Sequence, residues 1–334
     1  MTDRPLLAAV VGCGLIGQRR ARTMPGARLV ACADIDEPKA QGLARSIEGC
    51  RAFADWRVML DEVACDVVIV ATLHDTLAEI TAAAVARGRH VLVEKPAGRL
   101  SSDIEPVAAA AERAGVLVRV GYNHRYHRAF RQARQLVDAG AVGELMFVRG
   151  LYGHGGRPGY EREWRADPKR SGGGELIDQG PHLIDLARWF LGEFVDIRGV
   201  ADTFFWNMPV DDNGFLLLRT AGRRTAFLQV SCTEWKNKFS FEIYGRTGKI
   251  EVSGLGGSYG VERIALYRML PEMGPPETTI WEYPMADDSW AVEFAELVDD
   301  IRLKRQPAVG LRDAVAVLRV VEQIYETSGY DHRS

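Results

Sequence analysis

The sequence predicts an α/β protein with two domains, in which a doubly wound parallel sheet precedes a second α/β domain with a mostly antiparallel sheet. The chain has 334 residues, which is long for one hydrophobic core. Its first third alternates short apolar runs with helical stretches, and from residue 196 strand-like segments follow one another directly. The expected domains are residues 1–121 and 122–334.

The first domain is expected to hold a parallel sheet because its apolar runs are short and continuous. Buried parallel strands are covered on both faces, so they read as uninterrupted hydrophobic segments. Helical stretches at 77–87 and 104–114 lie between such runs. The expected strands are residues 6–11, 29–33, 67–71, 91–93 and 116–120.

The second domain is expected to open with helices and a long polar loop and to continue as a sheet. Turn signals such as Ala221-Gly222 and Thr247-Gly248 separate some of its strands, which indicates antiparallel pairing. The expected helices are 125–139, one ending near 191, 289–304 and 311–325, and the expected strands are 145–150, 197–201, 215–220, 225–231, 239–244, 249–252, 264–269 and 279–283.

Composition excludes several classes of protein. A net charge of −3 argues against a nucleic-acid binder, and no apolar run approaches the roughly 20 residues that span a bilayer. The first five residues lead straight into a strand, which leaves no room for a signal peptide. Five cysteines without a Cys-x-x-Cys pair indicate reduced core residues of a cytoplasmic protein, and no cluster predicts a metal site.

A glycine-rich turn, Gly12-Cys13-Gly14-Leu15-Ile16-Gly17, follows the first apolar run directly. In a dinucleotide-binding βαβ unit the first glycine makes a tight turn and the second lets the backbone approach the pyrophosphate. The third lets the helix pack close to the strand, and the helix N-terminus faces the anion. The preceding strand and following helix supply the context that gives this motif its meaning.

Asp34 ends the second apolar run, 20 residues after Gly14. A carboxylate there accepts hydrogen bonds from the adenosine ribose and repels a 2′-phosphate. Asp36 and Glu37 add negative charge, so the sequence predicts NAD rather than NADP. The alternative is that Asp34 and Asp36 are ordinary turn residues.

Two further segments carry candidate chemistry. Glu94-Lys95-Pro96 ends a predicted parallel strand, where ligands of such sheets bind, although a solvated lysine is common at strand ends. Asp178 and His182 are four residues apart and would share one face of a helix, with Pro181 a possible kink. Asp185 and Trp189 continue that polar stripe, which otherwise reads as the wet face of a helix.

The glycine turn, the Glu94-Lys95-Pro96 triplet and the Asp178-x-x-x-His182 helix, in this order, resemble the glucose–fructose oxidoreductase/inositol dehydrogenase (Gfo/Idh/MocA) family over essentially the whole chain. The resemblance implies an N-terminal Rossmann domain and a C-terminal α/β domain with a large open sheet that often forms the oligomer interface. It also implies nicotinamide-dependent oxidation or reduction of sugars and cyclitols, with Lys95, Asp178 and His182 as the catalytic group.

The chemistry of these side chains suits those roles. Imidazole has an unperturbed pKa near ~6.5, so His182 can accept the hydroxyl proton at neutral pH. Asp178 would orient the imidazole, and Lys95 would stabilise negative charge on the substrate oxygen.

The resemblance extends the site to further residues, with one departure. The family often has Thr-Pro-x-x-x-His after the fourth strand, whereas this chain has Thr72-Leu73-His74. A Trp-Arg pair before the glycine run lies near the cofactor in relatives, although Trp164 could equally serve packing. The expected cofactor contacts are Gly12, Gly14, Leu15, Ile16, Gly17, Asp34, Ile35, Thr72, His74, Glu94, Lys95, Trp164 and Arg165. The expected substrate contacts are Lys95, Asn123, Arg125, Arg157, Tyr160, Asp178 and His182.

The favoured function is an NAD-dependent dehydrogenase of a secondary sugar hydroxyl. Five basic and three acidic residues between Arg157 and Arg170 favour a nucleotide-activated sugar, because arginine suits a diphosphate. Free sugars, anhydrosugars or inositols are the alternative substrates, and a non-catalytic cofactor-bound regulator or scaffold is the alternative of another class. A homodimer or homotetramer built through the second sheet is expected.

Overall fold

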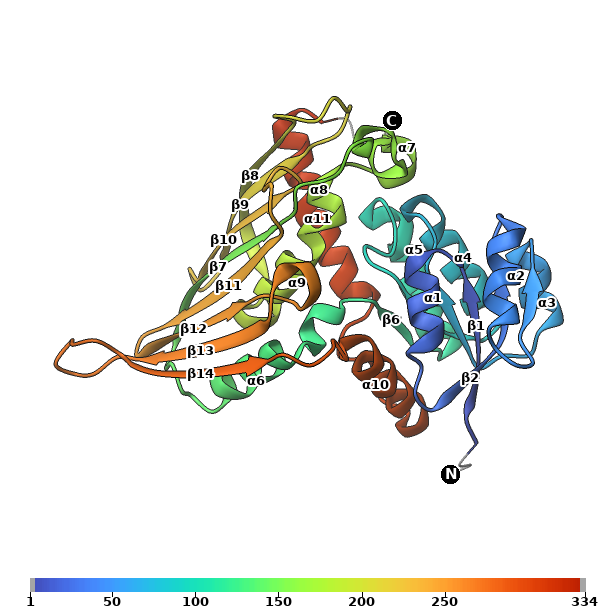
Figure 1. The fold of residues 1–334 in the computed structure, drawn as a ribbon, viewed down its shortest axis with the longest axis horizontal. Coiled ribbons are helices and arrows are strands. Elements are labelled where there is room, and N and C mark those ends of the chain that lie inside the picture. Colours follow the sequence, from blue (N-terminus) through green and yellow to red (C-terminus); the bar gives the residue numbers. More distant parts are fainter. Residues whose placement is uncertain (1–3, 331–334) are drawn as a thin grey trace. The chain divides into compact units, whose positions relative to one another are not determined.

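The computed structural model describes residues 4–330, which form two compact units (Figure 1). The first unit comprises the chain up to Tyr122 together with Trp290–Val315. The second comprises Asn123–Ser289 and the chain from Ala316 onward. The break after Tyr122 lies one residue from the expected boundary, whereas the return of Trp290–Val315 to the first unit differs from the expectation.

The first unit is a parallel sheet of six strands in the order β3-β2-β1-β4-β5-β6. The strand order reverses at β1 and β4, and ligands of such sheets bind beyond the carboxyl ends at this point. The strands are β1 (Leu6–Val11), β2 (Ala27–Ala33), β3 (Arg51–Phe53), β4 (Val67–Val70), β5 (His90–Val93) and β6 (Val118–Val120). The helices are α1 (Leu15–Arg22), α2 (Glu37–Arg45), α3 (Trp56–Glu62), α4 (His74–Ala86), α5 (Ser101–Ala114) and α10 (Ser289–Leu303).

Helix α10 belongs to the first unit because both apolar and ionic contacts hold it there. Phe294 and Leu297 are fully buried in the core of the parallel-sheet unit. Arg119 on β6, also fully buried, forms an ion pair with Asp300 on α10. The partners lie 181 residues apart, so no local sequence pattern reveals this packing.

The second unit contains a sheet of eight strands in the order β14-β13-β12-β11-β7-β10-β9-β8. Only the pair β7 and β10 is parallel within this sheet. The strands are β7 (Leu145–Gly153), β8 (Phe194–Asp202), β9 (Asn213–Thr220), β10 (Thr225–Ser231), β11 (Lys238–Gly245), β12 (Gly248–Ser253), β13 (Glu262–Arg268) and β14 (Glu277–Tyr283). The helices are α6 (Arg128–Asp138), α7 (Pro168–Ser171), α8 (Glu175–Asp178), α9 (Gly180–Leu191) and α11 (Leu311–Ser328).

The two faces of the eight-stranded sheet differ. Helices α6 and α9 pack on one face (Figure 1). The other face exposes large apolar side chains on neighbouring strands, where Phe227 pairs in register with Leu217 and with Arg149. The fold class predicted from the sequence is therefore confirmed, and the open sheet keeps one uncovered face.

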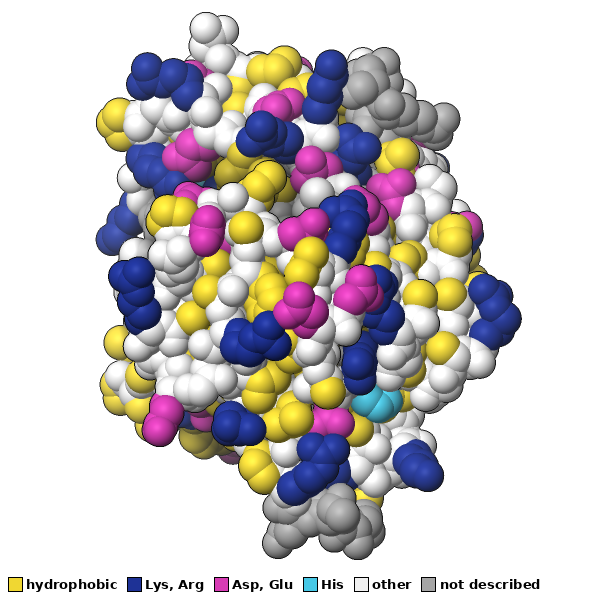
Figure 2. Space-filling model, turned by 90° about the vertical axis from the view of Figure 1, so that its right-hand side faces the viewer, with side chains coloured by type: hydrophobic (Ala, Val, Ile, Leu, Met, Phe, Trp, Pro, Cys, Tyr) yellow, Lys and Arg dark blue, Asp and Glu magenta, His cyan; other side chains and the backbone are white. Residues whose placement is uncertain are grey.

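The surface carries both signs of charge. Figure 2 shows basic and acidic side chains intermingled over one face of the molecule, in keeping with the net charge of −3. Among residues 4–330, no helix combines the length and the apolar character needed to cross a membrane.

Candidate active site and cofactor site

The turn between β1 and α1 is built around two crowded glycines. Gly12 has a φ of +90°, and a Cβ there would lie 2.4 Å from the carbonyl oxygen of Ala71. A Cβ at Gly17 would lie 1.7 Å from the carbonyl oxygen of Gly12. A Cβ at Gly14 meets nothing within 4 Å. Close packing therefore requires the first and third glycines, and the second leaves open space at the start of α1.

Asp34 braces this turn from the end of β2. Its Oδ2 accepts from the backbone N–H of Cys13 at 2.7 Å, and its Oδ1 accepts from that of Asp36 at 2.8 Å. Each carboxylate oxygen retains a further lone pair for a ribose hydroxyl. Leu15 and Ile35 flank the turn with exposed apolar side chains, 85% and 97% accessible, which suits contact with a ligand.

The loop after β4 also lies beside the glycine turn. A Cβ at Gly12 would lie 3.0 Å from the backbone nitrogen of Thr72, whose hydroxyl accepts from that of Thr76 at 2.9 Å. His74 is the first residue of α4 and is buried. The loop of Thr72 thus lies directly beside the first glycine of the turn.

Lys95 sits in a tight turn at the end of β5. The carbonyl oxygen of Glu94 accepts from the N–H of Ala97 at 3.0 Å, so that turn encloses Lys95 and Pro96. Lys95 itself is half-buried. Buried Arg20 from α1 holds the Glu94 side chain, with 2.7 Å between its Nε and Glu94 Oε1.

Asp178 and His182 lie on consecutive helices, not on the single helix that the spacing suggests. Asp178 is the last residue of α8, Gln179 follows it, and α9 begins at Gly180. The N–H of His182 donates to the carbonyl oxygen of Gln179 at 3.1 Å, so backbone hydrogen bonding continues through the junction. Both side chains are buried.

A buried carboxylate, Asp211, anchors the start of α8. It accepts from the backbone N–H groups of Gly174 at 2.8 Å and Leu176 at 2.7 Å, and from the Tyr325 hydroxyl at 2.7 Å. Burial raises the pKa of Asp211 to about 6, against the lowering effect of these donors. A Cβ at Gly174 would lie 1.9 Å from the Asp211 carbonyl oxygen, which explains the glycine.

Arg165 is the ion-pair partner of Asp178. Its Nε lies 2.8 Å from Asp178 Oδ2, and its guanidinium also lies 4.6 Å from the ring centroid of Trp164. Burial lowers the pKa of Arg165, but the Asp178 carboxylate outweighs it and the net shift is upward. The expected cofactor contact is thus also the counterion of a candidate catalytic residue.

The His182 imidazole lies in a cluster of rings. Its centroid is 3.8 Å from that of His124 and 6.2 Å from that of Tyr152. His124 follows Asn123 at the start of the second unit, and Asn123 donates to the Ser289 hydroxyl at 3.0 Å. The cluster brings side chains from segments that are distant in sequence together around the His182 imidazole.

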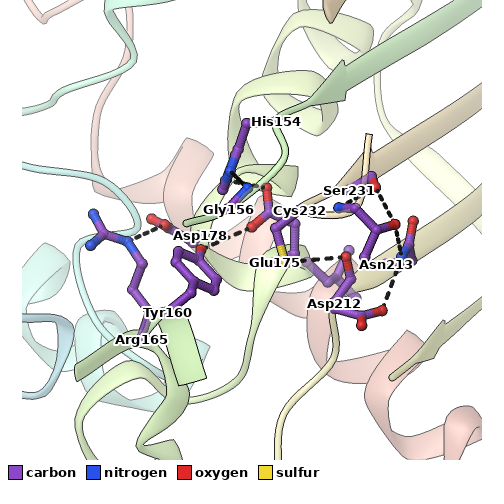
Figure 3. Close-up of polar contacts among 12 residues, drawn as sticks. His154, Gly156, Tyr160, Arg165, Glu175, Asp178, Asp212, Asn213, Ser231 and Cys232 are labelled. Atoms are coloured by element: carbon purple, nitrogen blue, oxygen red, sulfur yellow. Dashed lines mark hydrogen bonds and ion pairs between the residues drawn. The ribbon is translucent and has the colours of Figure 1, made fainter. Parts of the chain in front are cut away.

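Glu175 is a buried residue that sequence reasoning missed. Its Oε1 lies 3.4 Å from His154 Nε2, and its Oε2 lies 3.5 Å from the Tyr160 hydroxyl (Figure 3). Burial lowers the pKa of His154, whereas Glu175 and Asp178 raise it, with a net upward shift. A glutamate inside the run Gly-Gly-Gly-Glu-Leu-Ile was the available signal, because a charge within a buried segment needs a partner.

The arginines expected to contact substrate have protein partners. Arg125 forms a buried two-pronged pair with Asp185, at 2.7 and 2.6 Å. Arg157 pairs with Glu163 at 2.7 Å in the polar loop. Asp185, read from the sequence as part of a polar stripe, therefore has a structural counterion.

The candidate residues fall into two groups. The glycine turn, Asp34, Thr72, Glu94 and Lys95 belong to the first unit, and Asp178, His182, Arg165 and their neighbours belong to the second. Among residues 4–330, no group of three or more His, Cys, Asp or Glu side chains forms a metal site.

The fold and the glycine turn define an NAD-binding Rossmann protein with a second α/β unit. Residues 6–122 match the family model described as "Oxidoreductase family, NAD-binding Rossmann fold", and residues 130–251 match "GFO/IDH/MocA C-terminal domain". The chain belongs to the Gfo/Idh/MocA family of oxidoreductases, which confirms the family predicted from the motifs.

Two curated relatives are similar over different shares of the chain. Inositol 2-dehydrogenase 2 of Saccharopolyspora erythraea is 33% identical over 189 residues, 55% of this chain and 53% of that protein, so the match spans about half of the relative's length. A dTDP-3,4-didehydro-2,6-dideoxy-alpha-D-glucose 3-reductase of Streptomyces violaceoruber is 27% identical over 97% of this chain and 94% of its own.

A solved structure supports the fold across the whole chain. GenD2 from gentamicin A biosynthesis, crystallised with NAD, has a TM-score of 0.83 and 27% identity, and the alignment covers 100% of this chain and 96% of GenD2. The predicted NAD-binding domain therefore has both sequence and structural support.

Proposed function

We propose that the protein is an NAD-dependent dehydrogenase that transfers a hydride between a secondary hydroxyl carbon of a sugar and the nicotinamide. The observation that carries this proposal is the buried site around His182. An imidazole there is packed against His124 at 3.8 Å, four residues after a carboxylate paired with Arg165. Such a site can accept the proton that a hydroxyl loses as it is oxidised.

Four residues divide the chemistry. His182 accepts the hydroxyl proton, and Lys95 has the role that the family resemblance implies, which is to stabilise negative charge on the substrate oxygen. Asp178 stabilises the protonated imidazole, and Arg165 pairs with Asp178 in its buried position. NAD supplies the hydride acceptor when bound.

The first unit fits NAD better than NADP. Asp34 is already held toward the glycine turn through Cys13, and Asp36 and Glu37 add negative charge beside it. A 2′-phosphate would meet this charge without a dedicated arginine, since nearby Lys39 pairs with Asp36 at 2.9 Å.

A nucleotide-activated sugar is the preferred substrate class. The relative that matches almost the full chain is named as a dTDP-sugar reductase, and exposed Arg157 and Arg162 lie on the loop before the glycine run. Within that loop Arg157 pairs with Glu163 and Arg165 pairs with Asp178.

Free sugars, anhydrosugars or inositols are the second candidate class. The relative of highest identity named above is an inositol dehydrogenase, and a loop with compensated charge suits an uncharged polyol. A non-catalytic regulator is disfavoured, because such a protein has no need of Lys95, Asp178 and His182 together.

The uncovered sheet face supports a homodimer or homotetramer built through β7, β9 and β10. Phe227, Leu217 and Phe147 are 48%, 43% and 38% exposed there, and contiguous exposed apolar area marks interfaces. We expect Phe227→Glu to shift the protein toward monomer in analytical ultracentrifugation at micromolar concentration. A wild-type protein that is already monomeric would refute this assembly.

A substrate screen tests the proposed activity. NADH formation is followed with NAD⁺ and free sugars, anhydrosugars, inositols or nucleotide sugars, and NADH consumption with the corresponding keto compounds. Turnover of at least one sugar or cyclitol is expected. No turnover in either direction by a protein that binds NAD would favour the regulator instead.

A further inference from the structure

The end of β5 is held by a buried ionic cluster that links three separate segments of the first unit. Arg20 on α1 contacts Glu94 at the end of β5 and Glu293 on α10. Its side chain is fully buried, as is that of Glu293. Two carboxylates therefore share one guanidinium in a site shielded from solvent.

The two carboxylates contact different edges of the planar guanidinium group. Arg20 Nε and Nη2 lie 2.7 and 2.6 Å from Glu94 Oε1, and Nη1 lies 2.5 Å from Glu293 Oε2. The Trp290 ring packs over the guanidinium group, with its centroid 4.2 Å from the guanidinium carbon of Arg20. A rigid planar fork gripped on several sides has little freedom to move.

Glu94 is constrained at its backbone as well as at its side chain. Its N–H donates to the Val70 carbonyl oxygen at 2.9 Å, and its carbonyl oxygen accepts from Ala97 at 3.0 Å. Lys95 lies within the turn that this second bond closes. The side-chain contact with Arg20 therefore fixes the residue that immediately precedes Lys95.

Gly121 leaves space for the same contact. A Cβ at this position would lie 2.7 Å from Arg20 Nη2 and 3.1 Å from both carboxylate oxygens of Glu94. A side chain at this position would therefore displace the Arg20–Glu94 pair.

We propose that Arg20 is a positioning residue for Lys95, acting through the side chain of Glu94 and the turn from Glu94 to Ala97. The inference rests on the role proposed above for Lys95. Helix α1 begins at the glycine turn and carries Arg20, so in this proposal one helix supports both that turn and the turn that holds Lys95. Arg20 itself touches neither substrate nor cofactor in this account.

Glu94 and Glu293 provide a matched pair of variants. Glu94→Gln and Glu293→Gln each remove one buried carboxylate from Arg20, but only Glu94 is joined to Lys95. We expect Glu94→Gln to lower kcat about 10- to 100-fold, because small misplacements of a catalytic group have effects of this size. Glu293→Gln should keep kcat within about twofold, although it should lower the thermal stability about as much as Glu94→Gln does.

A second readout separates this inference from the proposed function. Lys95 in the NAD-free protein is labelled with an amine-reactive reagent, and its rate relative to exposed Lys39 is measured by mass spectrometry. We expect Glu94→Gln to change this ratio severalfold and Glu293→Gln to leave it unchanged, whether or not a sugar is turned over. Gly121→Ala places a methyl group against the Arg20–Glu94 pair without changing any charge, and it should give the same labelling ratio as Glu94→Gln. It replaces Glu94→Gln in this test if that variant does not fold.

Equal labelling ratios in wild type, Glu94→Gln and Gly121→Ala would overturn the positioning role of Arg20. An altered ratio in Glu293→Gln equal to that in Glu94→Gln would also overturn it, because the cluster would then act only through general stability. If the protein turns over no sugar, the proposed dehydrogenase activity is wrong, but the labelling ratios still test whether Arg20 positions Lys95.

Discussion

The glycine turn of the first unit and the buried site of the second differ in how they are built. Gly12, Gly17 and Asp34 act within one βαβ unit, where spacing along the chain fixes their contacts. Asp178 and His182 depend on Arg165 and His124, which arrive from other segments. A binding motif can therefore be read locally, whereas the environment of a catalytic residue is assembled over long range.

If this comparison holds, variants of the buried site around His182 should affect turnover, and variants of the glycine turn and Asp34 should affect cofactor affinity. The largest effect is expected at His182. His182→Ala should lower kcat about 10²–10⁴-fold, because general acid–base catalysis typically contributes that much, and NAD affinity should stay nearly unchanged. Steady-state kinetics and calorimetric titration measure the two quantities.

A second buried histidine provides the control for that variant. His127 pairs with Glu262 at 3.2 Å in the same unit, and His127→Gln should leave kcat far closer to wild type. Asp178→Asn should lower kcat less than His182→Ala does, because the imidazole that accepts the proton would remain. Near-normal turnover by His182→Ala would show that the proton leaves by another route, most directly through Lys95.

Cofactor choice gives the next largest effect and concerns the first unit. Asp34→Ala should weaken NAD⁺ binding about 10-fold and narrow its advantage over NADP⁺, since a charged hydrogen-bond acceptor is lost. Asp61→Ala is the matched control in the same unit, because its exposed side chain pairs with Arg87 and not with the turn. Equal or tighter binding of NADP⁺ by the wild type in calorimetry would contradict the assignment.

The smallest effect concerns the pH dependence of stability at Asp211. Its pKa of about 6 lies above the ordinary value, so the native state takes up a proton more readily than the unfolded state. Its contribution therefore increases as pH falls from about 7 towards 4, by at most about 3 kcal/mol. Asp211→Asn should remove this dependence and, by losing an acceptor, destabilise the protein at neutral pH.

Thermal melting between pH 4 and 7 measures that difference between wild type and variant. Half-buried Asp196, paired with Arg198, supplies the control Asp196→Asn, whose stability should follow the pH dependence of the wild type. The same pH dependence in wild type and Asp211→Asn would show that Asp211 does not titrate in this range.

The same difference between local and long-range contacts decides which parts of the fold could be predicted from the sequence. The glycine turn and five of the six parallel strands were predicted from spacing and apolar runs, and they are confirmed. The edge strand β3 (Arg51–Phe53) was missed, because three residues that begin with an arginine form no apolar run. The return of α10 to the first unit was not predicted, because its ionic contact joins Arg119 to Asp300 across 181 residues. Helical patterning alone states that a segment is amphipathic but not which sheet it covers.

The site shows the same limit. Spacing predicted that Asp178 and His182 would share one face of a single helix, whereas the structure places them on consecutive helices. Spacing also did not predict the counterion Arg165 or the buried Glu175. An arginine in a polar loop has many available acids, and only the fold selects one. Arg125 and Arg157 illustrate this, since residues expected to meet substrate have Asp185 and Glu163 as partners.

Isotope transfer tests the central claim most directly. A sugar or cyclitol that the screen identifies is deuterated at the carbon bearing the oxidised hydroxyl and incubated with NAD⁺ and the protein. The account predicts deuterium at C4 of the reduced nicotinamide, formed by wild type and about 10²–10⁴-fold more slowly by His182→Ala. Reduced cofactor without deuterium, or transfer at equal rates by both proteins, would contradict it.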